Sequence, residues 1–345
     1  MKKNLFLIDC DTEEIIPFYN EISRVTRRKF ELRIDEECIA LNKSRNGLGG
    51  ELKRYFRYFA TAFQLFRDRE QYDLIVCWQQ FYALIFCLYC SFFCVSKCNL
   101  VVACNYTYKE KKKFGRLYYK FMKYCMDEKY LDFIHIPSVE YAKTISDRFN
   151  FDEKKIIVAP FGIPDIYEKY RNVDAPEDFH KNEYYFSVGR SNRDFDFLIR
   201  AWSGVGRRLV IASDTYEGDA NNENVKIRRD ISADEQYVWI ANCKALIIPI
   251  DEPGIASGDT TLLTGMSFEK IVIVTKPSTL AEMYIKNEVD GIAVDKDVEE
   301  FQAIIEKLER GEFNYIRHKA REKYLKEYSR EILARNIAIR INEKL

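Results

Sequence analysis

Two segments in the second half of the chain carry residue types suited to binding a diphosphate. In the first, a predicted strand ends just before Gly189, Arg190 and Arg193, and a predicted helix follows. A glycine lets a ligand approach the backbone closely, and two guanidinium groups can hold phosphate oxygens through charge-assisted hydrogen bonds. The alternative is that both arginines are solvated or pair with the neighbouring aspartates.

The second segment, 248–266, joins a predicted strand to an apolar helix through Ser257, Gly258 and Asp259. The first N–H groups of a helix lack partners within the helix and attract anions. Additional hydroxyl donors are offered by Ser257, Thr260 and Thr261. Ordinary helix capping by Ser257 or Asp259 is the alternative. Two such elements in one half of the chain favour a site for a nucleotide diphosphate.

Alternating strands and helices must position both segments. Strands are predicted at 3–9, 72–77, 99–104, 133–137 and 155–159, then at 184–188, 208–212, 245–250 and 271–275, with helices between them. This alternation predicts an α/β fold with parallel sheets covered by helices on both faces. Ligands bind such sheets at the carboxyl ends of the strands, where both segments are expected to lie.

A length of 345 residues predicts two domains. The alternation breaks at 160–183, where prolines and charged residues are mixed. We therefore expect a first Rossmann-like domain at 1–165, a linker at 166–182 and a second Rossmann-like domain at 183–325. A last helix, at 326–345, is expected to return to the first domain.

The composition of the chain reduces the number of possible functions and cellular compartments. Hydrophobic residues make up 47%, which excludes a disordered chain, and 54 basic against 54 acidic residues make a nucleic-acid partner less favoured. The most apolar stretch, 81–95, falls short of the ~20 residues that a membrane-spanning helix needs. Cys87, Cys90, Cys94 and Cys98 recur on one helical face, which favours core packing over a metal site. Without a signal peptide, the chain is predicted to be cytoplasmic.

The order of motifs resembles the family-4-type glycosyltransferases with the GT-B fold. The segments that carry the resemblance are the Gly-Arg pair before a helix, the pattern S-G-x-T-x-L-L at 257–263, KIVIV at 270–274 with Glu282 downstream, and IIVAPFGIP at 156–164. DLIVCWQQF at 73–81 is similar to a branch involved in bacterial surface polysaccharide synthesis. The resemblance is specific over 133–295 and weaker over 1–130.

The resemblance implies two Rossmann-like domains facing across a cleft, and sugar transfer from a nucleotide-sugar donor, such as a UDP- or GDP-sugar, with retention of anomeric configuration and without a metal. Arg190 matches the family's Gly-Arg arginine, and Arg193 stands where the family usually has lysine. These two are the expected catalytic residues, because they would stabilise the leaving diphosphate. The expected donor-binding residues are Gly189, Arg190, Arg193, Glu252, Ser257, Gly258, Asp259, Thr260 and Thr261.

One departure from the family pattern concerns its pair of glutamates eight residues apart. Those positions are Ala256 and Thr264 here. The second glutamate normally holds the ribose hydroxyls, and a threonine cannot accept the same pair of hydrogen bonds. Glu252 and Asp259 are the nearby candidates to replace it. The departure also motivates a second hypothesis, a non-catalytic GT-B subunit that binds and supports a partner glycosyltransferase.

The acceptor side is expected in the first half, at residues that follow predicted strands. These candidates are Asp11, Gln79, Gln80, Asn105 and Tyr106. His135 lies within a predicted strand and is interpreted as a packed core residue. A lipid-linked or growing cell-surface glycan is the expected acceptor.

A basic and aromatic helix at 106–124 is the last feature. The residues expected to face a membrane are Lys111, Lys112, Lys113, Phe114, Arg116 and Lys120. Each such cation adds about 1 kcal/mol of attraction to an anionic lipid surface. The alternative is a solvated basic face over a buried aromatic stripe. The membrane interpretation places the protein at the inner face of the cell membrane.

Overall fold

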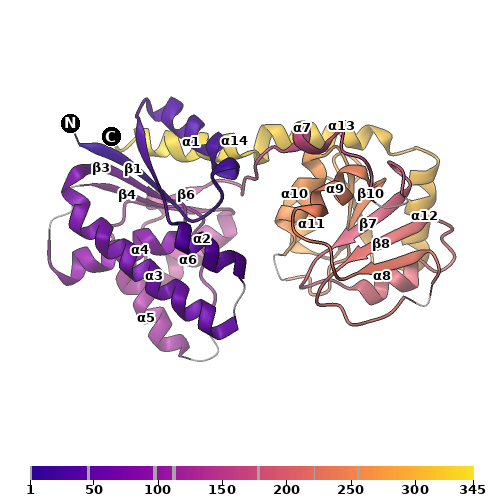
Figure 1. The fold of residues 1–345 in the computed structure, drawn as a ribbon, viewed down its shortest axis with the longest axis horizontal. Helices are drawn as coiled ribbons and strands as arrows, with labels where there is room; N and C mark the ends of the chain where they lie inside the picture. The colour runs from indigo at the N-terminus through magenta and orange to yellow at the C-terminus, as the bar shows by residue number, and fades with distance from the viewer. Residues whose placement is uncertain are drawn as a thin grey trace. The chain divides into compact units, whose positions relative to one another are not determined.

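The computed structural model describes residues 2–44, 47–95, 99–110, 114–176, 179–220, 222–254 and 257–345, and the chain forms two compact units. Unit 1 comprises residues 1–164 and 330–345, and unit 2 comprises residues 165–329 (Figure 1). Each unit is built on one six-stranded sheet in which all strands are parallel. The predicted α/β class is therefore confirmed.

The sheet of unit 1 has the order β2-β1-β3-β4-β5-β6. Its strands are β1 (Lys3–Ile8), β2 (Phe30–Ile34), β3 (Tyr72–Cys77), β4 (Leu100–Ala103), β5 (Phe133–Ile136) and β6 (Ile156–Val158). Its helices are α1 (Thr12–Thr26), α2 (Glu36–Ser44), α3 (Gly47–Asp68), α4 (Gln80–Phe92), α5 (Gly115–Cys125), α6 (Val139–Phe149) and α14 (Arg330–Asn342).

The two faces of this sheet bury two separate cores. Successive side chains of a strand point to opposite faces. Leu5 and Leu7 of β1 accordingly pack into the core beneath α2 to α6, whereas Phe6 and Ile8 pack into the core beneath α1 and α14 (Figure 1). The C-terminal helix thus completes the core of unit 1, although α14 is separated from the rest of that unit by 165 residues of sequence.

The sheet of unit 2 has the order β12-β11-β10-β7-β8-β9. Its strands are β7 (Tyr184–Val188), β8 (Arg208–Ala212), β9 (Val225–Arg228), β10 (Ala245–Ile248), β11 (Ile271–Lys276) and β12 (Ile292–Asp295). Its helices are α7 (Tyr167–Tyr170), α8 (Phe195–Ala201), α9 (Glu235–Asn242), α10 (Asp259–Ser267), α11 (Thr279–Tyr284), α12 (Val298–Glu309) and α13 (Asn314–Lys323), followed by a π-helical turn (Tyr324–Tyr328).

The segment 166–182, for which the sequence predicts a linker, is instead part of unit 2. The ring of Tyr170 lies 5.4 Å from that of Tyr237 and 6.0 Å from that of Phe268. The side-chain amide of Asn242 donates to the carbonyl of Val173 at 3.1 Å. These contacts hold the segment against α9 and α10. The predicted last helix is also divided, since α14 begins at Arg330 after the turn at 324–328.

Across the described ranges, every helix is too short or too polar to cross a membrane.

Candidate functional site

The strand order of unit 2 predicts where a ligand binds. β7 and β10 are neighbours, and the chain continues outward from them in opposite directions, to β8 and β9 on one side and β11 and β12 on the other. In a parallel sheet the carboxyl ends of two such strands leave a crevice between their loops. The two loops here are 189–194 and the described residues 249–254 and 257–258, which belong to the segments singled out by their residue types.

Hydrogen bonds join these two loops to each other. Arg193 forms an antiparallel bridge with Ile250. The side-chain amide of Asn192 pairs with Glu252, accepting from its N–H at 2.6 Å and donating to its carbonyl at 3.1 Å. The loops therefore present their side chains from one connected backbone, and the Glu252 side chain itself is exposed.

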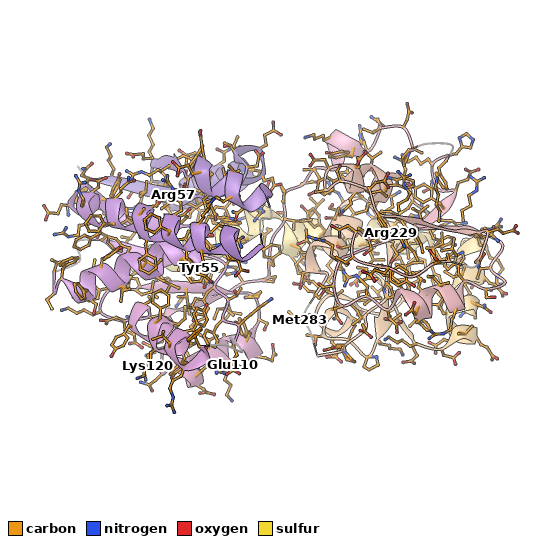
Figure 2. The ribbon with its side chains drawn as sticks, turned by 60° about the horizontal axis from the view of Figure 1, so that its bottom comes forward. Tyr55, Arg57, Glu110, Lys120, Arg229 and Met283 are labelled. Atoms are coloured by element: carbon orange, nitrogen blue, oxygen red, sulfur yellow. The ribbon has the colours of Figure 1, made fainter. Side chains whose placement is uncertain are left out.

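The guanidinium of Arg193 lies between two glycines at the centre of this site. An added Cβ at Gly189 would lie 2.6 Å from Nε of Arg193, and one at Gly258 would lie 2.7 Å from its Nη2. Gly258 also has a φ of +104°, which side-chain-bearing residues rarely adopt. Both positions therefore need glycine for Arg193 to lie where it does. Figure 2 shows the side chains of the described residues.

Neutral oxygens surround Arg193. Its Nη1 donates to the carbonyls of Ser191 and Asn192 at 3.3 and 3.1 Å and to the hydroxyl of Ser257 at 3.3 Å, and Nε donates to the carbonyl of Val188 at 3.4 Å. Burial lowers the pKa of Arg193 to about 10, and the nearby carboxylate of Asp259 opposes that shift. The group stays charged at neutral pH, and an anion bound against it would relieve the cost of its burial.

Arg190 lies beside this site but is held differently. Its Nε donates to Oδ1 of Asp214 at 2.7 Å, and its carbonyl accepts from the hydroxyl of Thr215 at 2.6 Å. Both members of the ion pair are about half exposed, and pairs of this kind contribute little stability. Arg190 can therefore exchange Asp214 for a phosphate at small cost. The expected alternative of pairing with Asp194 does not occur, because Asp194 binds Lys296 at 2.8 Å and the N–H of Phe197 at 2.9 Å.

The start of α10 supplies the third part of the site. Gly258 is its N-terminal cap, and no side chain caps the helix. The predicted donor residues Ser257, Asp259, Thr260 and Thr261 are half-buried or exposed at this end. Backbone N–H groups and the guanidinium of Arg193 thus come together within one turn.

Of the two positions where the family has glutamates, Ala256 and Thr264, the structure describes only the second. Ala256 lies outside the described residues. Thr264 is buried, and its hydroxyl donates to the carbonyl of Thr260 at 2.7 Å, so it is turned into α10. Asp259, proposed as a replacement acid, lies near the buried Tyr284, whose pKa is raised by burial and by that carboxylate.

Two of the predicted acceptor residues in unit 1 belong to the core, which corrects those assignments. Tyr106 is fully buried and its hydroxyl contacts Sδ of Met126 at 2.9 Å. The side-chain amide of buried Gln80 exchanges two 3.0 Å hydrogen bonds with the backbone of Thr107. Both side chains are buried and hydrogen-bonded within unit 1, so they are not presented to an acceptor.

The other three acceptor candidates lie at the carboxyl edge of the sheet of unit 1. Asp11 caps α1 by accepting from the N–H of Glu13 at 3.1 Å. Gln79 precedes α4 without a capping side-chain bond. Asn105 donates from its side chain to the carbonyl of Trp78 at 3.3 Å. These three side chains keep atoms accessible to a ligand.

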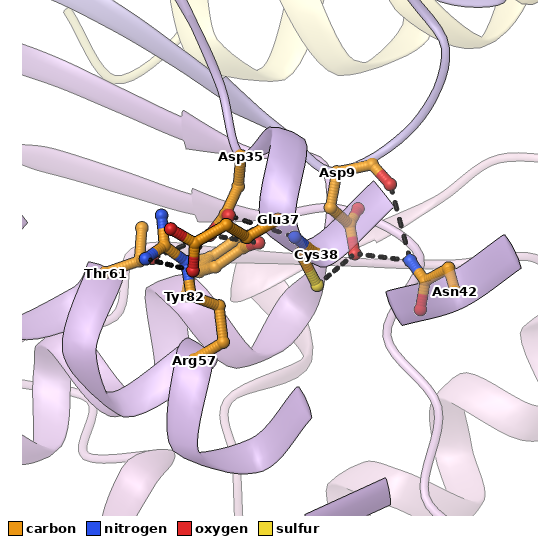
Figure 3. A network of polar contacts seen from close by, with 8 residues as sticks. All are labelled: Asp9, Asp35, Glu37, Cys38, Asn42, Arg57, Thr61 and Tyr82. Atoms are coloured by element: carbon orange, nitrogen blue, oxygen red, sulfur yellow. Dashed lines mark hydrogen bonds and ion pairs between the residues drawn. The ribbon is translucent and has the colours of Figure 1, made fainter. Parts of the chain in front are cut away.

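A buried carboxylate network lies at the same edge (Figure 3). It joins Asp9, which the sequence places directly after the first strand, to Asp35, which the sequence analysis missed. Asp35 is 2% exposed and accepts from Arg57 Nε at 2.8 Å, Thr61 Oγ1 at 2.6 Å and the Tyr82 hydroxyl at 3.1 Å. Asp9 has longer contacts, to Asn42 at 3.5 Å and Cys38 at 3.7 Å, and burial raises its pKa. The only sequence signal for the pair is that each aspartate directly follows a strand, and their partners come from distant helices.

The predicted membrane-facing residues divide in two. Lys111, Lys112 and Lys113 lie outside the described residues. Phe114, Arg116 and Lys120 are exposed at or on α5, and Lys120 projects from unit 1 (Figure 2). Leu117 and Tyr124 on the same helix are also exposed, at 66% and 68%. The outer face of α5 is therefore both basic and apolar.

No group of three or more His, Cys, Asp or Glu side chains among the described residues could hold a metal ion.

No protein-family model matches the chain, and no curated protein matches its sequence. Solved structures do match. HepE from Anabaena, in complex with UDP and glucose, aligns over 100% of both chains with a TM-score of 0.63 and 14% identity. A glycosyltransferase from Rickettsia africae aligns over 99% of this chain and 98% of its own, with a TM-score of 0.62 and 14% identity. The lipopolysaccharide outer core galactosyltransferase WaaB aligns over 100% of both chains, with a TM-score of 0.57 and 15% identity. These likenesses establish that the chain has the expected GT-B fold.

Proposed function

We propose that this protein is a glycosyltransferase that moves a sugar from a nucleotide-sugar donor to a lipid-linked or growing cell-surface glycan. The observation that carries the proposal is the half-buried guanidinium of Arg193 between Gly189 and Gly258, beside the uncapped start of α10. A half-buried cation next to uncapped N–H groups is suited to a diphosphate. HepE has been solved with UDP-glucose and the same overall fold, which supports a nucleotide sugar as the ligand.

The proposed chemistry is electrostatic. As the bond between the sugar and the diphosphate breaks, negative charge develops on the departing phosphate oxygens. Arg193, Arg190 and the N–H groups at the start of α10 would stabilise that charge in place, without a metal. Retention of anomeric configuration is inferred from the family resemblance. The donor-binding set Gly189, Arg190, Arg193, Glu252, Ser257, Gly258, Asp259, Thr260 and Thr261 remains a proposal, with Glu252 the weakest member because its side chain points to solvent.

Nucleotide-induced stabilisation tests the proposal. Wild-type protein is heated with UDP, GDP, ADP or CMP, and one diphosphate is expected to raise the melting temperature, since a ligand at 100 times its Kd adds about 2.7 kcal/mol. Arg193→Ala should abolish the shift, while Arg200→Ala, an exposed arginine on α8, should retain it. Transfer activity should fall roughly 10²- to 10³-fold in Arg190→Ala. Unchanged turnover in that variant would show that Arg190 is not catalytic.

A second candidate function is a non-catalytic subunit that supports a partner glycosyltransferase. The burial of the Thr264 hydroxyl within α10 favours it, because that position then offers no acceptor for ribose hydroxyls. Two measurements separate these functions, the response to nucleotides and co-purification with a partner. A supporting subunit would show no response to any nucleotide at millimolar concentration and would co-purify with a second protein.

The outer face of α5 suggests where the protein works. Exposed Arg116 and Lys120 lie among exposed apolar side chains, a combination suited to an anionic bilayer surface. We infer that the protein is cytoplasmic and peripheral on the inner face of the cell membrane, where a lipid-linked acceptor would be presented.

A further inference from the structure

A second cluster of cations lies in unit 2, at the edge of the sheet opposite the Arg193 site. It lines a small pocket of about 120 Å³. The pocket lining includes four basic residues, Arg171, Lys181, Lys270 and Arg317, and one acidic residue, Glu269. Arg171 pairs with Glu168 at 2.9 Å. Lys270 directly precedes β11, whereas the donor site lies beyond the carboxyl ends of the strands. Six residues of β11 at about 3.3 Å each separate the two edges by roughly 20 Å.

Lys270 is the buried member of this cluster. Its side chain belongs to a residue only 4% exposed, and Nζ donates to the carbonyl of Cys243 at 3.0 Å. That bond uses one of the three protons of the ammonium group. Burial lowers the pKa of Lys270 to about 8, and the positive charges of Arg317 and Lys181 contribute to the lowering. A buried ammonium group among other cations is costly unless an anion compensates it.

Unsatisfied polar atoms accompany this charge. Among the described residues, the buried donor Nε of Arg317 has no hydrogen-bond partner, and neither has the buried acceptor Oδ1 of Asn182. Buried polar atoms in native proteins are nearly always bonded to protein or solvent species. The Glu269 carboxylate accepts from the hydroxyl of Tyr167 at 3.2 Å. With Arg171 paired to Glu168, three cations among the described residues of the lining, from Lys181, Lys270 and Arg317, remain against the one carboxylate of Glu269. The pocket therefore has an excess of positive charge and an unused donor, Nε of Arg317.

We propose that this pocket is a binding site for a phosphate-sized oxyanion, in the form of inorganic phosphate or the terminal group of a phosphate monoester. Lys270 and Arg317 are its anchors, and Lys181 and Arg171 lie at its mouth, where both are exposed. The volume of about 120 Å³ leaves room for a small anion with four oxygens on one central atom. The site does not depend on the proposed transferase activity.

Binding of inorganic phosphate to the full-length protein tests this site. Titration calorimetry at pH 7 and constant ionic strength should give saturable binding. Lys270→Met, which keeps the length of the side chain, and Arg317→Gln should each raise the Kd at least tenfold. Lys319→Met is the matched control, because Lys319 is exposed on the same helix as Arg317 and should leave the Kd unchanged. Arg193→Ala should also leave it unchanged.

A phosphate monoester, phenyl phosphate, identifies the form of the ligand. If phenyl phosphate binds more tightly than inorganic phosphate, the site is assigned to a monoester, and if it binds more weakly, the site is assigned to the free ion. Either result supports the site, provided that Lys270→Met weakens the binding. A near-ultraviolet circular dichroism spectrum identical to that of wild type shows that a variant is folded. If Lys270→Met is not folded, the phosphate affinity of Arg317→Gln decides whether the site exists. Absence of binding at 10 mM phosphate, or binding lost in Arg193→Ala but kept in Lys270→Met and Arg317→Gln, would overturn the proposal.

Discussion

At the scale of single residues, the donor site depends on Gly258 as much as on Arg193. Its φ of +104° is unfavourable for any other residue, and a Cβ there would push against Nη2 of Arg193. Gly258→Ala should therefore displace the guanidinium and weaken diphosphate binding at least tenfold, measured by calorimetry with the nucleotide that stabilises wild type. Gly254→Ala is the matched control, since Gly254 lies in the same loop with no atom within 4 Å of an added Cβ. Equal affinity in the two variants would contradict this role.

Buried His135 predicts how stability depends on pH. Its Nδ1 accepts from the N–H of Asn105 at 3.2 Å, so Nε2 carries the proton and donates to the carbonyl of Ala159 at 2.9 Å. Burial lowers the pKa of His135 from 6.5 to about 4, although the bond to Ala159 opposes the shift. The unfolded chain takes up a proton below pH 6.5 and the folded chain does not, so stability is lost as the pH falls from 6.5 to 4.

The shifted pKa of His135 contributes on the order of 3 kcal/mol to the free energy of unfolding above pH 6.5, and this contribution is lost below pH 4. Urea unfolding at pH 7 and pH 5 should show a loss of stability in wild type that is much smaller in His135→Gln, which keeps hydrogen-bonding atoms without titrating. The same loss in both proteins would assign the acid sensitivity to other groups. This residue was correctly interpreted from the sequence as part of the core.

A residue's role could be predicted from the sequence where it depends on neighbours along the chain, and could not where it depends on residues far away in the sequence. Arg193 and Gly258 were proposed as donor residues because each lies in the loop between a strand and the next helix, and such a position can be predicted from local patterns. The pairing of Arg190 with Asp214 depends on β8 lying next to β7, which local patterns do not determine. Tyr106 also follows a strand, yet it is buried, because α5 brings Met126 over it. Position after a strand therefore selects candidates but does not decide their exposure.

At the scale of elements, α5 carries the prediction about membranes. Neutralising two cations by Arg116→Gln and Lys120→Gln should remove about 2 kcal/mol of attraction, or roughly 30-fold in affinity, for vesicles of anionic phospholipid. Sedimentation with vesicles at low and high salt measures it. Changing Lys2 and Lys344 to glutamine, two exposed lysines outside α5, should have a smaller effect. Salt-insensitive binding, or equal losses in both pairs, would refute a role for this helix.

Element types were more predictable than their grouping. The alternation of strands and helices follows from apolar runs and caps, and Ser138 caps α6 as its sequence indicates. The segment 166–182 was predicted as a linker because Pro176 and the charged residues around it resemble those of a linker, but it groups with unit 2. Its attachment to unit 2 rests on Tyr170, Val173 and their distant partners.

At the scale of the whole molecule, unit 1 is assembled from both ends of the chain. α14 contributes Leu333, Ala334, Ile337, Ala338 and Ile341 to the core on one face of the first sheet. This core also contains Phe18 and Ile22 of α1. Unit 1 therefore cannot complete its core until the last residues are in place, whereas unit 2 is continuous in sequence.

Ile337 tests this dependence, because it is fully buried in that core. Ile337→Ala should destabilise unit 1 by about 2–5 kcal/mol through lost burial and the cavity left behind. Ile339→Ala is the matched control, since Ile339 on the same helix is 47% exposed and should cost much less. Hydrogen exchange read by mass spectrometry separates the units: amides of β1 and α1 should exchange faster in Ile337→Ala, and those of β10 should not. Equal exchange in the two variants would mean that α14 is dispensable to unit 1. Faster exchange in β10 as well would mean that the two units unfold together. The loss of one buried side chain in α14 would then also destabilise the unit that carries the donor site.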